Sequence, residues 1–349
     1  MKNPLVSILI PNYNYGQYVS NCLDSVLNQT YDNYEVIISD NRSQDDSYNI
    51  IMSYSEKFKA KGIWYDFLQN KRNIGSSGNT EVCFHRSEGK YFIWLSSDDA
   101  LEPTAIEEMV KGLEEYPTAG CAMIHRNEID EHGNITAKPS FYNQSCFIPG
   151  EEQAAVYMMA GIGVSSQILF RRSTYIVMLR YKLLRFQVAG DWYDNFLLSC
   201  FGDVIYIKKP LVNYRVHSAN ETSESERNLL GILEHYQLIL AFENLANSFG
   251  MTKPQKRKEE AVKKLGVMAL RYVRKMILNE EYEAALKYLQ VANIFDENIT
   301  ENVQYNQLAD ILNRKNPKQE IEQIENEGIF ERLVSYDPPE NSVRLTTYE

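Results

Sequence analysis

The sequence lacks the residues and runs that mark several common classes of protein. Its five cysteines are widely spaced and include no C-x-x-C pair, so neither a zinc site nor a disulfide framework is indicated. No stretch approaches the roughly 20 apolar residues that a membrane-spanning helix needs. The apolar run at residues 5–10 is too short for a signal-peptide core, and no small-residue cleavage site follows it. We therefore expect a cytoplasmic protein with reduced thiols.

Positive charge is also scarce. The chain has 36 Lys and Arg residues against 47 Asp and Glu residues, which gives a formal net charge of −11. Because nucleic-acid binding needs a basic face, this balance argues against a broad nucleic-acid binder. Hydrophobic residues make up 44% of the chain and charged residues 24%, which is typical of a folded protein. At about 150 residues per domain, the length predicts roughly two domains.

The N-terminal part alternates strand-like and helix-like patterns. Strands are predicted at residues 6–10, 34–39, 63–68, 91–95, 120–125, 168–171 and 204–207. Helices are predicted at residues 18–29, 47–59, 79–87 and 103–116, with a hairpin turn at residues 130–134. This order predicts βαβ units, and hence an α/β fold with a mixed, mostly parallel sheet flanked by helices.

The character of the chain changes towards the C-terminus. Residues 227–333 contain few glycines and prolines and show long helical periodicity, which predicts a separate all-α domain. The stretch from residue 335 contains two adjacent prolines and is expected to be an extended or mobile tail. We therefore expect a catalytic α/β domain at residues 1–220, a helical domain at residues 221–334 and a tail at residues 335–349.

Polar side chains follow three of the predicted strands at the point where each strand ends. Asn12 follows the first strand, Asp40 the second, and Asp98 and Asp99 the fourth, which is almost entirely apolar. In open α/β sheets, ligands bind beyond the carboxyl ends of the strands. These residues therefore predict a binding site at one edge of the sheet.

Five segments, in order and with compatible spacing, carry a family resemblance. They read VSILIPNYN (residues 6–14), SVLNQTY (25–31), IISDNRSQD (37–45), NIGSSGN (73–79) and GKYFIWLSSDD (89–99). Together they resemble the family 2 glycosyltransferases, inverting enzymes of the GT-A fold that use nucleotide-diphospho-sugar donors. The resemblance covers roughly residues 4–220. It implies transfer of a sugar from a UDP- or dTDP-sugar to an acceptor hydroxyl.

The resemblance also implies roles for the residues at the strand ends. The residues expected to bind the nucleotide-sugar are Pro11, Tyr13, Asp40, Asn79, Asp98 and Arg215, with Arg72 as a weaker candidate. Asp99 is expected to ligate Mn²⁺ or Mg²⁺, because hard cations prefer oxygen ligands and a diphosphate leaving group needs its charge neutralised. His217 would complete the metal shell or contact the diphosphate, and Arg215 would neutralise phosphate charge. Asp98 would contact the donor ribose, and Asp40 would accept from the imide N–H of a uracil or thymine ring.

An inverting transfer also needs a base that accepts the proton of the acceptor hydroxyl. The segment GDWYDNFLL at residues 190–198 resembles the family's base-bearing helix start, which nominates Asp191. Asp194 is the weaker candidate and is expected on a different part of the helix surface. Trp192 and Tyr193 would form either a platform for the acceptor or part of the core. Asp191 also suits a helix N-cap.

Other readings of the sequence remain open. Ser39 and Ser96 replace aspartates that are common in the family, which keeps a degenerate, non-catalytic scaffold as an alternative. A nucleotidyltransferase is disfavoured, because the first strand is followed by PNYN and not by a Gly- and Arg/Lys-rich phosphate loop.

The acceptor could be a glycan, a lipid-linked saccharide or a protein. The basic cluster between Lys253 and Lys275 fits peripheral contact with the inner face of a membrane, docking of a protein, or a solvated helix face.

Overall fold

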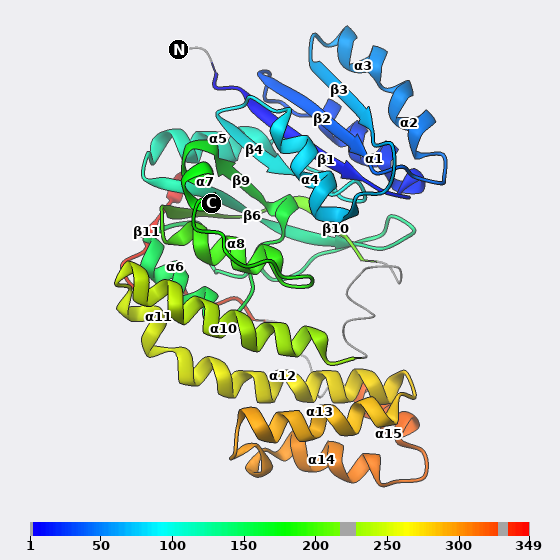
Figure 1. Ribbon diagram of the computed structural model, residues 1–349, viewed down its shortest axis with the longest axis vertical. Coiled ribbons are helices and arrows are strands. Elements are labelled where there is room, and N and C mark those ends of the chain that lie inside the picture. The colour runs from blue at the N-terminus through cyan, green and yellow to red at the C-terminus, as the bar shows by residue number, and fades with distance from the viewer. Residues whose placement is uncertain (1–2, 217–227, 327–333, 349) are drawn as a thin grey trace.

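Eleven strands form one mixed sheet in the computed structural model, which describes residues 3–216, 228–326 and 334–348. The strand order is β11-β8-β10-β6-β9-β4-β1-β2-β3, with β5 paired to β10 and β7 to β6 (Figure 1). The strands are β1 (Val6–Asn12), β2 (Tyr34–Asp40), β3 (Trp64–Gln69), β4 (Tyr91–Trp94), β5 (Ala100–Leu101), β6 (Ala119–Ile129), β7 (Ile135–Thr136), β8 (Cys146–Ile148), β9 (Ile168–Arg171), β10 (Asp203–Arg215) and β11 (Val343–Arg344).

The predicted α/β fold is confirmed, with its longest strand pairings parallel. β1 pairs in parallel with β2 and β4, and β2 with β3. β6 and β10 also run parallel, while β9 lies antiparallel between β4 and β6. β10 is much longer than the expected strand at 204–207, because it continues past register shifts near Pro210. These shifts let one strand follow β6 along its length and bring Arg215 to the far end.

Helices cover both faces of the sheet, because successive side chains of a buried strand point to opposite sides. The helices of this part are α1 (Gly16–Leu27), α2 (Ser47–Ser53), α3 (Ser55–Ala60), α4 (Gly75–His85), α5 (Ala105–Glu115), α6 (Gly150–Tyr157), α7 (Arg172–Leu179) and α8 (Gly190–Ser199). On β1, Ile8 and Ile10 pack in one hydrophobic cluster with α1 and α5. Leu9 belongs to another cluster, which extends to α6 and α8.

A helical region follows the sheet, as the sequence predicts. It consists of α10 (Leu230–Phe249), α11 (Thr252–Lys256), α12 (Lys258–Leu278), α13 (Tyr282–Phe295), α14 (Val303–Leu312) and α15 (Pro317–Asn326). In Figure 1, α12 to α15 lie farthest from the sheet and α10 lies between them and α8. Within the described residues, no helix is long and apolar enough to cross a membrane.

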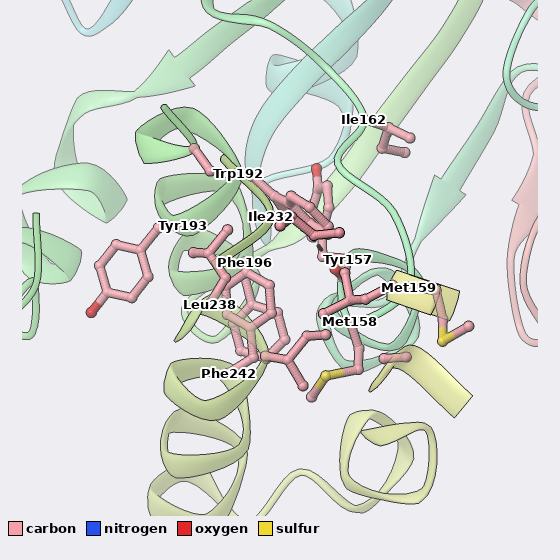
Figure 2. Packing of buried hydrophobic residues seen from close by; sticks show 14 of the residues in the cluster. Tyr157, Met158, Met159, Ile162, Trp192, Tyr193, Phe196, Ile232, Leu238 and Phe242 are labelled. Carbon is pink, nitrogen blue, oxygen red and sulfur yellow. Dashed lines mark hydrogen bonds between the residues drawn. The ribbon is translucent and has the colours of Figure 1, made fainter. Parts of the chain in front are cut away.

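α10 shares a hydrophobic core with α8. The rings of Phe196 and Phe242 stack with centroids 4.1 Å apart, and Trp192 packs against Phe242 at 6.0 Å (Figure 2). One cluster of buried side chains therefore runs from the sheet through α8 into the helical region. The expected division near residue 220 falls within residues 217–227, outside the described residues, and remains a prediction.

The segment expected as an extended or mobile tail is packed onto the sheet. β11 pairs antiparallel with β8, where Val343 lies opposite Phe147. Leu345 and Tyr348 are buried, and the Ser145 hydroxyl donates to the carbonyl of Tyr348 at 3.1 Å. This pairing joins residues almost two hundred positions apart, so local sequence patterns do not reveal it.

Candidate active site

The polar residues predicted at the strand ends meet at one edge of the sheet. Asn12, the last residue of β1, lies directly opposite Asp40, the last residue of β2. β4 runs beside β1 with Leu9 opposite Trp94, and its chain continues into Asp98 and Asp99. Parallel pairing thus brings the ends of three strands to one place, as expected from their order along the chain.

Asp40 is fully buried and its carboxylate is saturated with hydrogen bonds. Asn12 Nδ2 and Gln69 Nε2 donate to it at 2.9 Å each, and Ser43 donates through both its backbone N–H and its hydroxyl. An ionised carboxylate has about four acceptor sites, and all four are occupied here. A nucleobase would therefore have to displace one of these donors to reach Asp40.

Asn79 lies behind the strand ends. Its Nδ2 donates to the carbonyls of Ser39, at 2.9 Å, and Asn12, at 3.2 Å, while its Oδ1 accepts from Asn70 at 2.9 Å. The side chain is buried. In this arrangement Asn79 holds the ends of β1 and β2 in place, and its amide group makes no contact with the cavity described below.

Pro11 and Tyr13 lie on the accessible side of the same edge. Pro11 lines a cavity of about 560 Å³. Tyr13 follows β1 and is 41% exposed, beside a turn in which Asn14 adopts the left-handed region with φ 57°. An exposed ring is available for stacking on a planar ligand, although Tyr13 itself does not line the cavity. Arg72 is exposed in the following loop.

The Asp99 carboxylate is buried beside a second carboxylate, that of Asp98, which makes its negative charge unfavourable. Its Oδ1 accepts from the backbone N–H of Arg215 at 2.8 Å, and the Ser166 side chain also hydrogen-bonds the carboxylate, while Oδ2 is buried with no close hydrogen-bond partner among the described residues. Burial, and then the neighbouring charge of Asp98, raise the pKa of the Asp99 carboxyl well above its ordinary value. A cation placed here would compensate the burial of this charge.

The predicted metal site can be tested against these contacts. Asp98 and Asp99 supply carboxylate oxygens, the ligand type that Mg²⁺ and Mn²⁺ prefer, and one of those oxygens is buried and unpartnered. These two residues therefore fit a divalent cation. Within the described part of the chain no cluster of three or more His, Cys, Asp or Glu residues could enclose one. His217, the other predicted ligand, lies outside the described residues.

Arg215 is buried and its contacts are with the protein itself. Its Nε donates to the carbonyl of Asp98 at 2.9 Å and its Nη1 to the carbonyl of Asp130 at 2.5 Å. The guanidinium also lies 4.4 Å from the centre of the Tyr18 ring. Arg215 thus fixes the backbone that carries the paired aspartates, and the predicted phosphate contact would require a second role for it.

Asp191 opens into the cavity from the opposite wall. The N-cap of α8 is Ala189, so Asp191 lies inside the first turn, where its Oδ1 accepts from the backbone N–H of Trp192 at 2.8 Å. Pro11 and Ser96 line the same cavity from the strand ends. The carboxylate is accessible to a small molecule, yet the surrounding protein raises its pKa to about 6.

Of the residues near Asp191 on α8, Asp194 and Tyr193 line the cavity, whereas Trp192 packs in the core. Asp194 lines the same cavity, so the expectation that it lies elsewhere on the helix surface is wrong. Residues three apart on a helix share a face, which explains this. Asp194 pairs with Lys182 at 2.7 Å. Trp192 is a core residue whose Nε1 donates to the Tyr157 carbonyl at 2.7 Å, whereas Tyr193 lines the cavity.

Two residues that the sequence reading missed lie close enough to these carboxylates to shift their charge balance. The Arg126 guanidinium on β6 stacks 4.3 Å from the ring of Tyr214 on β10. The positive charge of Arg126 lowers the pKa of both Asp99 and Asp191, partly offsetting burial. Burial raises the pKa of Tyr214, and the charges of Asp99, Asp98 and Asp191 raise it further. Arg126 directly follows the strand predicted at 120–125, but β6 continues to Ile129, so Arg126 lies within the strand and the strand-end rule does not account for it.

The fold is GT-A-like, paired aspartates follow β4, and the Asp191 carboxylate shares a cavity with Pro11 and Ser96 at the strand ends. These features are those of the sugar-nucleotide transferase class. Residues 7–184 match the model of glycosyl transferase family 2. The chain belongs to this family, which confirms the resemblance.

Known relatives and structures agree with this assignment. A chondroitin synthase of Escherichia coli is 38% identical over 133 residues, an alignment that covers 38% of this chain and 18% of the synthase. TarS of S. aureus, solved in complex with UDP-GlcNAc, has a TM-score of 0.53 at 16% identity and covers 85% of this chain and 91% of its own. The mannosyltransferase PcManGT of Pyrobaculum calidifontis was solved with GDP-Man and Mn²⁺. It has a TM-score of 0.52 at 15% identity, and the match covers 95% of this chain and 89% of PcManGT. At these identities the two structures show likeness of fold alone.

Proposed function

We propose that the protein transfers a sugar from a UDP-sugar, or a dTDP-sugar, to an acceptor hydroxyl with inversion at the anomeric carbon. The proposal rests on one geometric feature. Asp191 opens into the same cavity as Pro11 and Ser96, so a carboxylate faces the strand ends at which sugar nucleotides bind in this fold class. The donor fits between them, with its anomeric carbon towards α8.

In the proposed reaction Asp191 is the general base. The acceptor oxygen attacks the anomeric carbon, its proton passes to the Asp191 carboxylate, and the bond to the diphosphate breaks with its electron pair on the nucleotide. A pKa of about 6 suits this role, because the group is largely ionised at neutral pH yet more basic than an ordinary carboxylate. Asp194 is already paired with Lys182, which makes it the poorer base.

The donor would be held along the strand ends. Tyr13 offers an exposed face for the nucleobase, with Pro11 beside it. Asp40 and Asn79 would shape that side of the site from behind. Asp98 would contact the ribose, as the family resemblance implies. The UDP-GlcNAc complex of TarS supports a uridine nucleotide and an N-acetylhexosaminyl donor, whereas PcManGT binds GDP-Man.

A divalent cation would be held by Asp99 and Asp98, with His217 as a further ligand. When bound, Mn²⁺ or Mg²⁺ neutralises the charge that develops on the leaving diphosphate. The unpartnered, buried Oδ2 of Asp99 supports this assignment, as does Mn²⁺ in the PcManGT complex. Arg126 lies near both Asp99 and Asp191, where a fixed cation also favours an anionic ligand.

The acceptor is a glycan, a lipid-linked saccharide or a protein, used on the cytoplasmic side of a membrane. The basic cluster between Lys253 and Lys275 is partly neutralised, since Lys253 pairs with Glu152 and Lys258 with Glu243. This pairing leaves the cluster a weaker candidate for membrane contact than its sequence suggests.

A ligand panel tests the proposal directly. Thermal unfolding is measured with UDP, UDP-GlcNAc, dTDP-glucose and GDP-mannose, each with and without Mn²⁺, because a ligand that binds the folded state raises its melting temperature. We expect the uridine nucleotides to give the largest increase, and to do so only with Mn²⁺. Nucleotide release from UDP-GlcNAc should then be lost in Asp191→Asn, while that variant keeps the thermal shift. A shift with GDP-mannose alone would overturn the choice of donor.

A further inference from the structure

The segment between β9 and α8 exposes an unusual number of apolar side chains. Leu183 is 86% exposed, the largest fraction of any large hydrophobic residue in the described ranges. Exposed apolar side chains on the same segment, which comprises α7 and residues 180–188, are Ile176, Val177, Leu179, Tyr181, Leu183 and Leu184. A contiguous exposed apolar patch usually marks a binding surface. We call residues 172–188 the α7–α8 segment.

The same segment is basic, in a chain that carries a net charge of −11. Between Glu152 and Asp191 the chain contains no aspartate or glutamate. Arg180 is exposed and forms no ion pair with any described residue. Lys182 and Arg185 reach Asp194 and Glu81, at 2.7 Å and 3.2 Å. Apolar side chains interleaved with cations are typical of segments that lie in the interface of an anionic membrane.

The α7–α8 segment also forms one wall of the cavity that contains Asp191. Leu179, Leu184 and Phe186 line this cavity together with Lys182. α7 and α8 follow one another against the sheet in Figure 1. Anything bound to the exposed side of the segment therefore lies next to the wall of the cavity that contains Asp191.

The fold holds both ends of the exposed stretch. At its tip the backbone of Leu183 and Leu184 is hydrogen-bonded to Tyr193, while the Leu183 side chain is left in solvent. The buried Glu234 carboxylate of α10 accepts from the backbone N–H groups of Gln187 and Val188 at 2.9 Å and 2.8 Å. At the other end, the Tyr181 ring packs against Phe201 at 5.0 Å and Phe249 at 5.5 Å. Leu183 lies between these anchors and points its side chain to solvent.

We propose that the α7–α8 segment docks the protein on an anionic lipid bilayer, from which the acceptor is presented as a glycan on a lipid carrier. The acceptor half of this inference rests on the proposed transferase function; the docking half does not. The charge of Arg180 complements anionic headgroups, and Leu183 at the tip enters the interface beneath them. The hydroxyl of a membrane-held acceptor then approaches Asp191 along the wall formed by Leu184 and Phe186.

Vesicle sedimentation tests the docking. Wild-type protein is mixed with vesicles of phosphatidylglycerol and phosphatidylcholine, or of phosphatidylcholine alone. We expect binding to the anionic vesicles only, and about tenfold weaker binding for Leu183→Ser, because a buried leucine side chain contributes that much to partition. Ile294→Ser on α13 is the matched control, since Ile294 is 78% exposed but far along the chain in the helical region. It should bind like the wild type.

The outcomes separate this inference from the proposed function. Wild-type protein that releases nucleotide from UDP-GlcNAc yet ignores anionic vesicles overturns the docking and leaves the transferase intact. Vesicle binding without nucleotide release from UDP-GlcNAc, dTDP-glucose or GDP-mannose supports the docking and overturns the transferase. An equal loss in Ile294→Ser and Leu183→Ser also overturns the inference, because the α7–α8 segment would then have no special part. Leu183→Ser should release nucleotide in solution at the wild-type rate.

Discussion

The acidic limb of the pH–rate profile should report the ionisation of Asp191. Burial raises the pKa of this carboxyl to about 6, and the charge of Asp194 contributes in the same direction. A general base works only in its ionised form, so activity falls as pH falls through that pKa. With a pKa of about 6, about nine-tenths of the protein is ionised at pH 7 and about one-tenth at pH 5. We therefore expect about a tenfold loss of rate between pH 7 and pH 5.

The assay is nucleotide release from UDP-GlcNAc, with donor and Mn²⁺ saturating at every pH so that their binding does not shape the profile. Asp191→Asn should lose about 10²- to 10⁴-fold in rate, the usual contribution of a positioned base. Its residual rate should show no acidic limb. Asp194→Asn is the matched control on the same helix: it removes a neighbouring negative charge, so the limb should move to lower pH while the neutral rate persists.

A rate that stays flat from pH 7 to pH 5 in the wild-type protein would refute the assignment of the base. So would an Asp191→Asn variant that retains both the wild-type rate and its acidic limb. Thermal unfolding at pH 5 and pH 7 keeps loss of fold separate from loss of ionisation, because an unfolded sample at pH 5 would show no cooperative transition.

Three substitutions probe the rest of the site. Arg126→Ala removes a cation that lowers the pKa of Asp191, so the acidic limb should move to higher pH and UDP should bind more weakly by calorimetry. Glu234→Gln weakens two charge-assisted hydrogen bonds, each worth about 1.5–3 kcal/mol, and should lower the urea midpoint together with kcat. Asp99→Asn should abolish the Mn²⁺-dependent part of UDP binding by calorimetry, while thermal unfolding without ligand changes little or shows slight stabilisation, since a buried charge is removed.

Residues at the ends of short parallel strands could be placed from the sequence. Asn12 and Asp40 each close an apolar strand, and parallel pairing puts the ends of adjacent strands side by side without any further information. Asp98 and Asp99 follow by the same rule. The rule depends only on where a buried strand ends, which an abrupt change from apolar to polar residues marks clearly.

The direction of a long side chain could not be predicted in this way. Arg215 was expected to face phosphate, but its guanidinium binds the carbonyls of Asp98 and Asp130, which come from two other parts of the chain. Asn79 likewise turns to the carbonyls of Asn12 and Ser39. Buried donors must find acceptors, and which acceptors are near is decided by tertiary packing. Residue type at a motif position therefore predicts proximity to the site more safely than contact with a ligand.

The α7–α8 segment is proposed both to hold the base in position and to bind the membrane, and mutations can separate these two roles. Its inner end, at Gln187 and Val188, is fixed by Glu234, so a change there should alter the position of the base and hence kcat. At its tip Leu183 is hydrogen-bonded to Tyr193 through its backbone alone, so a change of the exposed Leu183 side chain should alter only where the protein binds. Because α10 supplies Glu234 and also stacks on α8, the first helix of the helical region is a structural support of the proposed catalytic site. A chain cut near residue 220 would lose this brace and expose the face of α8 that carries Phe196.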